Sequence, residues 1–342
     1  EILKEVKKGA LKKLKAEEGT EVEAVITVPA YFTSNQIDET KHAGEMAGLK
    51  VLGIVSEPRA AAIANIKELS IEEQKIFVVD LGGGTFDVSV LETSGAQYDT
   101  IAVDGNRRLG GDDFDDRLFE YIKAQMEDDL GIDLYSQATS GLSYNEYYSM
   151  LGRVQEAARE AKQDLSEEKE YVVDLPNLFS YKNESYTLKL PVTREKFYEL
   201  CDDLFQKIRD RIDKVFSEND SLQIGQIDRV ILAGGSCYIP KIKEDVEQIF
   251  GKSTDTLLDR SKMVVIGAAF IADSWDDVVH HKDIISHSLG IETLREDGKL
   301  VLSKLLLRGQ KYPDSAKHVF TTTVDNQERV SITIYEAGSD KE

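Results

Sequence analysis

The residues best suited to chemistry lie between Asp80 and Asp87, where Gly82, Gly83 and Gly84 stand in a row. Glycine lets the backbone come close to a ligand and point its amides at phosphate oxygens. The carboxylates at the two ends, with a third acid such as Glu57, could hold Mg²⁺ through its water ligands, and Thr85 would add a hydroxyl to the same site. The segment predicts a phosphate site. The competing interpretation is a glycine turn between two strands with aspartates facing water.

Two further glycine pairs could approach phosphate in the same way. Gly234 and Gly235 precede Ser236 at a predicted strand-to-helix turn, and Gly110 and Gly111 precede an acidic helix start. Taken alone, the first is explained by a tight turn and the second by a capped helix.

Lys162 and Ser166 are four positions apart on a predicted helix, so their side chains share one face. They are candidates for contact with a nucleoside. A solvated helix face with paired charges is the alternative.

The elements that must position these residues follow from hydrophobic periodicity and turn signals. We expect strands at 23–28, 51–55, 76–79 and 88–92, with helices at 33–48 and from Glu57 onward. Their β-α-β-α order predicts an α/β fold with a largely parallel, doubly wound sheet. The strands on either side of the glycine run are expected to form a hairpin.

Later segments predict a helical lobe and a second domain. Apolar residues recur at helical spacing over 112–130 and 144–165, and a strand at 230–232 precedes helices at 239–250 and 264–275. A polar connector follows at 276–283. Beyond it, alternating residues predict antiparallel strands at 289–294, 301–307, 319–323 and 330–335.

Composition limits the function classes. The formal net charge of −21 disfavours nucleic acid and anionic membranes as partners, and no apolar stretch is long enough to cross a bilayer. We therefore expect a cytoplasmic, monomeric protein. Cys201 and Cys237 lack metal-ligand spacing and are interpreted as packing residues, and the five histidines as exposed polar residues.

Taken in order along the chain, these motifs resemble the Hsp70 family of molecular chaperones. The resemblance rests on nine segments: 28–32, 57–62, 80–87, 109–115, 161–166, 234–240, 267–269, 288–293 and 320–327. Any one of them is weak evidence, but nine in order are specific.

The resemblance implies an actin-like, ribonuclease H-like ATPase domain over 1–275, with a helical subdomain at about 110–195. A linker at 276–285 and the start of an antiparallel β-sandwich that binds peptides at 286–342 would follow. ATP or ADP, Mg²⁺ and a potassium ion are the implied cofactors. Unfolded apolar peptide segments, a J-domain co-chaperone and a nucleotide exchange factor are the implied partners.

The family's functional roles transfer to matching positions. Asp80, Glu57, Thr85 and Asp87 would be catalytic, and Asp80, Glu57 and Asp87 would organise the metal. Nucleotide contacts would come from Gly82, Gly83, Gly84, Thr85, Gly111, Lys162, Ser166, Gly234, Gly235 and Ser236. The client pocket would be lined by Ile291, Leu294, Phe320, Thr323, Val330 and Ile332, although alternating apolar residues also fit a plain sheet core.

Some positions depart from the family pattern. Arg159, Gln163, Tyr238 and Ser261 replace residues of the nucleoside site, and Ile37 replaces an arginine that relays nucleotide state. The chain also opens within an amphipathic helix, so we expect a fragment that lacks the first phosphate loop and hydrolyses ATP poorly. A hydrolysis-impaired nucleotide-binding interaction protein, and another actin-fold ATPase such as a filament former or sugar kinase, are the alternatives.

Overall fold

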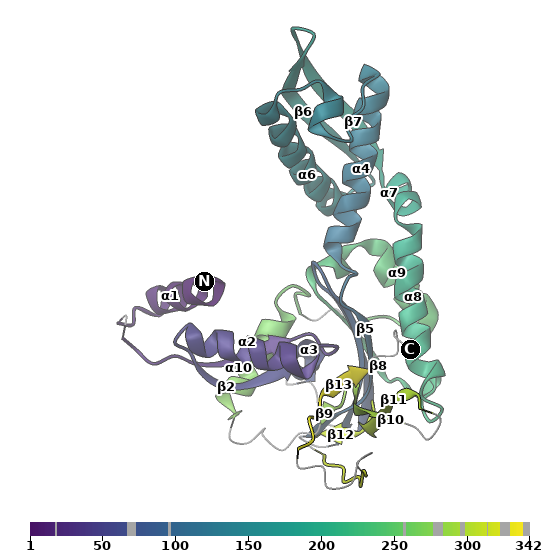
Figure 1. The fold of residues 1–342 in the computed structure, drawn as a ribbon. Coiled ribbons are helices and arrows are strands. Elements are labelled where there is room, and N and C mark those ends of the chain that lie inside the picture. The colour runs from purple at the N-terminus through teal and green to yellow at the C-terminus, as the bar shows by residue number, and fades with distance from the viewer. Residues whose placement is uncertain are drawn as a thin grey trace.

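The structure is a computed structural model that describes residues 1–17, 19–66, 73–94, 97–255, 258–275, 283–294, 298–312, 314–321 and 329–337. Figure 1 shows a central sheet, a helical lobe rising from one end of it, and a small group of C-terminal strands at the other end. The predicted mixture of helices and strands is confirmed. Among the described residues, none of the helices combines the length and apolar character that a bilayer-spanning segment requires.

The N-terminal region contains a parallel strand pair covered by helices. Its elements are α1 (Ile2–Leu14), β1 (Glu23–Val28), α2 (Ser34–Met46), β2 (Lys50–Ser56) and α3 (Glu57–Ile66). β1 and β2 pair in parallel. Thr33 caps α2 as predicted, because its hydroxyl accepts from the amide of Gln36 while the Gln36 side chain accepts from the Thr33 amide.

The central sheet consists of β3 (Gln74–Leu81), β4 (Phe86–Ser94), β5 (Gln97–Asn106) and β8 (Arg229–Ala233), in the order β5-β4-β3-β8. β3 and β4 form the predicted hairpin around the glycine run. The expectation of parallel pairing is confirmed for β1 and β2 but is wrong for the central sheet, where only the β3–β8 pair is parallel and β4 is antiparallel to both its neighbours. Two residues between β4 and β5 do not leave room for the crossover that parallel pairing needs.

The helical lobe contains a hairpin that the helical periodicity did not indicate. It comprises α4 (Gly111–Leu130), α5 (Gln137–Ser140), α6 (Tyr144–Glu167), β6 (Glu170–Tyr181), β7 (Glu184–Thr193) and α7 (Arg194–Leu200). β6 and β7 pair antiparallel beside α6 (Figure 1). Buried residues alternate along both strands, at Val173 and Leu175 and at Leu188 and Val192, so the period-two signal was present in the sequence.

One continuous core joins this lobe to the central sheet. Phe77 on β3 packs against Phe250, and Phe114 on α4 packs against Phe205, with ring centroids 4.7 Å and 5.3 Å apart. The remaining elements of this part are α8 (Asp202–Ser217), the short turns η1 (Ile224–Gln226) and η2 (Gly235–Tyr238), α9 (Pro240–Phe250) and α10 (Met263–Asp273). Cys201 and Cys237 are buried and unpaired, as predicted.

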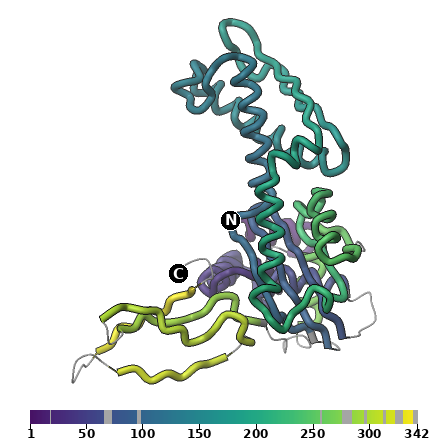
Figure 2. Tube along the Cα trace, turned by 90° about the vertical axis from the view of Figure 1, so that its right-hand side faces the viewer, coloured from purple at the N-terminus to yellow at the C-terminus, as the bar shows by residue number. Residues whose placement is uncertain are grey.

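The C-terminal strands form two small sheets beside the main body (Figure 2). β10 (Ser288–Leu294) pairs antiparallel with β11 (Leu300–Leu306) and with β13 (Ile334–Ala337), and β9 (Asp283–Ile284) pairs with β12 (Lys311–Tyr312). Two of the predicted strands need correction, because residues 319–321 and 330–333 are not in strands. Their alternating apolar residues find no partner strand among the described residues, and alternation without pairing does not make a strand.

Candidate functional site

Three glycine turns, which are far apart in the sequence, come together at the ends of β3 and β8. Gly111 donates its amide to the carbonyl of Gly82 at 2.9 Å, and Asp112 donates to that of Gly83 at 2.7 Å. The hydroxyl of Ser236 donates to the same Gly82 carbonyl at 2.8 Å. The turns at 82–85, 110–111 and 234–236 therefore form one cradle of main-chain groups.

The cradle requires glycine where the turns touch. A Cβ on Gly110 would lie 2.4 Å from the carbonyl oxygen of Gly83, and one on Gly111 would lie 2.4 Å from the Ser236 hydroxyl. Gly234 has a φ of +87° and would place a Cβ 2.3 Å from the Leu81 carbonyl. Gly83 and Gly84 stay exposed, so the inner surface of the cradle is open to a ligand.

The acids beside the cradle are buried. Asp80 lies one residue before the end of β3, opposite Asp87 on β4, and these residues are only 6% and 2% exposed. The Oδ2 atom of Asp80 has no hydrogen-bond partner among the described residues, whereas Asp87 accepts from the backbone amide of Tyr31 at 3.0 Å. A buried oxygen without a partner is costly and fits the role of a group that binds a hydrated cation.

Burial changes the protonation of these acids. It raises the pKa of Glu57 to about 7, with a further contribution from the charge of Asp80, and it raises the pKa of Asp80 to about 6. It also raises the pKa of Asp87 well above its ordinary value. A cation bound beside these crowded carboxyl groups would stabilise their ionised forms.

Protein stability without ligand should therefore depend on pH. In the folded state the pKa values of Glu57 and Asp80 are higher than their unfolded values of 4.5 and 3.8. The stability that comes from keeping these two groups protonated is therefore complete below about pH 4, and it is lost as pH rises through 6 to 7. Asp80→Asn should raise the free energy of unfolding at pH 8 by on the order of 2 kcal/mol, with little change at pH 4.

Urea unfolding at both pH values measures this difference. Asp116→Asn, an exposed acid on α4, is the matched control and should leave the curve unchanged. If the free energy of unfolding of wild type and of Asp80→Asn changes with pH in the same way, ionisation of Asp80 does not affect stability and the prediction is wrong.

A lysine lies next to the cradle. The ammonium group of Lys162 on α6 donates to the carbonyl of Gly111 at 2.9 Å and lies 2.8 Å from a carboxylate oxygen of Asp115. Sequence reasoning missed Asp115 as its partner, although the acidic run at 112–115 was a signal. Ser166 lies one turn further along α6 and donates to the carbonyl of Lys162 at 3.0 Å.

Two of the positions that depart from the expected pattern, Arg159 and Tyr238, contact other residues of the chain. Arg159 lies 3.8 Å from both Asp115 and Glu156. The hydroxyl of Tyr238 donates to Asp259 at 2.8 Å, and the ring lies 5.4 Å from the guanidinium of Arg260. Tyr238 thus presents a fixed, half-exposed aromatic ring two residues after the Ser236 turn.

The predicted metal residues do not form a ready-made coordination shell. In the part of the chain that the structure describes, no three His, Cys, Asp or Glu side chains come together as direct metal ligands. The arrangement of Asp80, Glu57 and Asp87 is compatible with the expectation that a cation would be held through water molecules.

Most of the predicted client-pocket residues are exposed at the surface. Ile291 is buried in β10, whereas exposure is 52% for Leu294, 47% for Phe320, 58% for Val330 and 63% for Ile332. Thr323 lies outside the described residues. A cavity of about 500 Å³ does occur nearby, between the C-terminal sheet and the N-terminal region, but other residues line it, among them Tyr31, Arg107, Leu300 and Leu302.

The expectation of exposed histidines is wrong for His287. It is only 4% exposed, and its ring lies 4.4 Å from the ring of Tyr31. The neighbouring serine binds the same region, since Ser286 donates to the carbonyl of Phe32 at 3.1 Å. The physical reason is the docking of the C-terminal sheet, a long-range contact that local composition does not encode. His280 and His281 lie outside the described residues.

Comparison with models of known protein families gives a match over nearly the whole chain. The family described as Hsp70 protein matches residues 1–341. The match includes the three glycine turns, the buried acids and the C-terminal strands.

Proposed function

Because the chain belongs to the Hsp70 family, we propose that it works as an ATP-dependent molecular chaperone, in which nucleotide at the cradle controls the capture and release of extended apolar peptides. The observation that carries this proposal is the convergence of the turns at 82–85, 110–111 and 234–236 beside Asp80. Phosphoryl transfer depends on positioning and charge neutralisation, which such a site supplies.

Each residue then has a role set by its chemistry. Amides of Gly83, Gly84 and Gly235 would bind phosphate oxygens, and Thr85 would donate its hydroxyl to the terminal phosphate. Asp80, Glu57 and Asp87 would accept hydrogen bonds from the water ligands of Mg²⁺, which when bound neutralises charge on the phosphates. Lys162 and Ser166 would contact the nucleoside from α6.

The domain organisation is part of the same proposal. Residues 1–275 would form the nucleotide-binding unit, 276–285 the connection, and 286–342 the beginning of the peptide-binding unit. Exposed apolar side chains at Leu294, Phe320, Val330 and Ile332 support peptide capture. A J-domain protein and a nucleotide exchange factor are the expected co-chaperones.

Peptide release tests the chaperone role. With the full-length protein and a fluorescent apolar heptapeptide, ATP should lower peptide affinity by about 5- to 150-fold, the usual range for coupled sites. Asp80→Asn should bind the peptide as wild type does but respond less to ATP. Peptide affinity that is the same with and without ATP in the wild type would contradict the proposal.

A second candidate is a nucleotide-binding protein that does not turn over. It is favoured by Arg159 and Tyr238, which are tied to internal partners at positions where the family contacts the nucleoside. Single-turnover phosphate release from ATP separates the two candidates, since Mg²⁺-dependent release excludes the inert one.

A further inference from the structure

The acids around the glycine cradle have no cation of the chain to compensate them. Burial raises the pKa values of Asp80, Asp87 and Glu57, and neighbouring carboxylates raise the pKa values of Asp87 and Glu57 further. No lysine or arginine in the described part of the chain counteracts this rise. A fourth acid, Asp112, is exposed, and one of its carboxylate oxygens lies 3.7 Å from the place that a Cβ on Gly83 would occupy. A phosphate group in the cradle therefore meets several negative charges.

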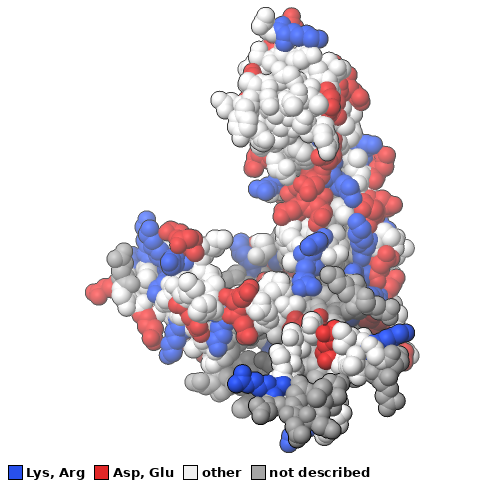
Figure 3. All heavy atoms as spheres, viewed as in Figure 1, with Lys and Arg blue, Asp and Glu red and all other residues white. Residues whose placement is uncertain are grey.

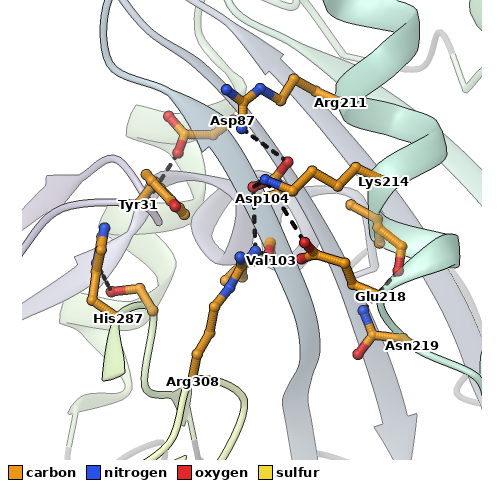
Figure 4. A network of polar contacts seen from close by, with 12 residues as sticks. Tyr31, Asp87, Val103, Asp104, Arg211, Lys214, Glu218, Asn219, His287 and Arg308 are labelled. Atoms are coloured by element: carbon orange, nitrogen blue, oxygen red, sulfur yellow. Dashed lines mark hydrogen bonds and ion pairs between the residues drawn. The ribbon is translucent and has the colours of Figure 1, made fainter. Parts of the chain in front are cut away.

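Two cations of the central body serve a different acid. Arg211 and Lys214 on α8 lie 3.5 Å and 3.9 Å from carboxylate oxygens of Asp104 on β5. Figure 4 shows both side chains pointing at Asp104, while Asp87 accepts from the backbone amide of Tyr31. Because Asp104 is fully buried, it needs this compensation. The two cations therefore stay with Asp104 and do not neutralise the phosphate site.

The cations beside the other two glycine turns are held in place. Lys162 donates to the carbonyl of Gly111 and lies 2.8 Å from a carboxylate oxygen of Asp115. Arg260 donates to the carbonyl of Cys237, just after the turn at 234–236. Movement of either side chain toward a phosphate group would break a contact that already exists.

Arg108 differs from these cations. Its side chain is exposed, and its guanidinium makes no hydrogen bond or ion pair with any residue that the structure describes. Its backbone is fixed, because the amide donates to the Oδ1 atom of Asn106 at 2.9 Å. Two residues of chain span at most about 7 Å, so this backbone lies that close to Gly110, which packs directly on Gly83. A long cationic side chain without a partner thus starts from a fixed point beside the cradle.

We propose that Arg108 binds the terminal phosphate of a bound nucleoside triphosphate, so that the cradle prefers a triphosphate to a diphosphate. The proposal rests on the proposed function, because it needs nucleotide phosphates in the glycine turns. A planar guanidinium can donate two hydrogen bonds to one phosphate group, and it stays charged at physiological pH. The same cation would offset the charge of Asp112 at the open side of the cradle.

Nucleotide affinity tests this role. The full-length protein is titrated by calorimetry with Mg²⁺-ADP and with Mg²⁺-ATPγS, which is hydrolysed slowly. Arg108→Ala should weaken ATPγS binding by about 10- to 100-fold, the usual contribution of hydrogen bonds to a charged group, and should leave ADP binding nearly unchanged. Unchanged ADP binding also shows that the variant is folded. An equal loss for both nucleotides, or no loss for ATPγS, overturns the proposal.

Arg107→Ala is the matched control, because it removes the same charge from the neighbouring residue. The guanidinium of Arg107 donates to the Oε1 atom of Gln36 at 3.2 Å and lies 6.0 Å from the centre of the Tyr31 ring. A single exposed charge contributes little at a distance, so both nucleotides should bind this variant as they bind wild type. If Arg107→Ala weakens ATPγS binding as much as Arg108→Ala does, the effect is long-range attraction and the proposed contact is wrong.

Chemical protection gives a second test that needs no substitution. Phenylglyoxal modifies arginine side chains, and peptide mass spectrometry of the wild type measures its reaction at Arg108. ATPγS should slow this reaction clearly more than ADP does, because only ATPγS places a terminal phosphate beside Arg108. Equal protection by the two nucleotides, or none by either, contradicts the proposal.

The wild-type titrations separate this proposal from the proposed function. A wild type that binds neither nucleotide rejects the proposed function, and the role of Arg108 with it. A wild type that binds both nucleotides, together with an Arg108→Ala variant that binds both equally well, rejects only the role of Arg108.

Discussion

Asp80→Asn should lower the single-turnover rate of Mg²⁺-dependent ATP hydrolysis by the full-length protein by about 100-fold or more. The substitution keeps the shape of the side chain but removes the negative charge that would organise the metal waters, and the loss of one preorganised electrostatic contact costs about 10²- to 10³-fold. Asp80 is a buried acid, and one of its oxygens lacks a hydrogen-bond partner among the described residues. Phosphate release after rapid mixing with ATP is the measurement.

The control for this prediction is Asp116→Asn on α4, which removes one charge from an exposed site. It should leave the rate unchanged. A rate for Asp80→Asn within about threefold of wild type would remove Asp80 from the mechanism. A wild type that binds nucleotide but releases no phosphate would favour the hydrolysis-impaired candidate.

Gly267→Ala should destabilise the protein by about 3 kcal/mol, at the upper end of the usual cost of overpacking. In most helices the same substitution would stabilise by up to about 1 kcal/mol, since alanine has the better helix propensity. Here a Cβ would lie 1.8 Å from the carbonyl oxygen of Ala60 and 2.4 Å from its carbon. Those are backbone atoms of α3, so α10 and α3 must separate.

Gly152→Ala is the matched control, because Gly152 lies within α6 and a Cβ there meets nothing within 4 Å. Urea unfolding should show the two variants moving in opposite directions. A Gly267→Ala variant as stable as wild type would contradict the close contact between α3 and α10. Since α3 begins at Glu57, that contact also determines where one of the three acids lies.

Sequence reasoning predicted the local features because neighbouring residues determine them. The cap at Thr33, the hairpin around Gly82 to Gly84 and the helix that begins at Gly111 all depend on short-range hydrogen bonds and backbone freedom. The three glycine turns could be suggested as one site only through the order of motifs along the chain. Nothing in their spacing brings 82–85 within hydrogen-bond distance of 234–236.

Long-range contacts explain what the sequence did not predict. β8 pairs with β3 across about 150 residues, as in the Val78–Ile231 pair, and strand direction in such a sheet depends on tertiary packing rather than propensity. His287 is buried where the C-terminal strands pack against the N-terminal region, beside Tyr31.

The net charge follows from the composition alone, whereas the positions of the charged side chains on the surface depend on the fold. On the face shown in Figure 3, a broad area just below the tip of the helical lobe carries few charged side chains, while acidic and basic side chains are mixed along its stem. Many charged side chains form pairs of opposite sign, for example Arg117 with Asp203 at 2.8 Å, and the formal net charge of −21 comes from the excess of acidic over basic residues. Net charge predicted which partners are disfavoured, but not where the phosphate-binding amides lie.

Hydrogen–deuterium exchange with and without Mg²⁺-ADP tests most directly whether the glycine turns grip a nucleotide together. When Mg²⁺-ADP binds, exchange should become slower in all three of the peptides that cover 80–87, 110–113 and 234–238. Asp80→Asn should weaken this protection in each of them. Nucleotide that binds without slowing exchange at these turns, or that protects only one of them, would show that they do not converge on the ligand.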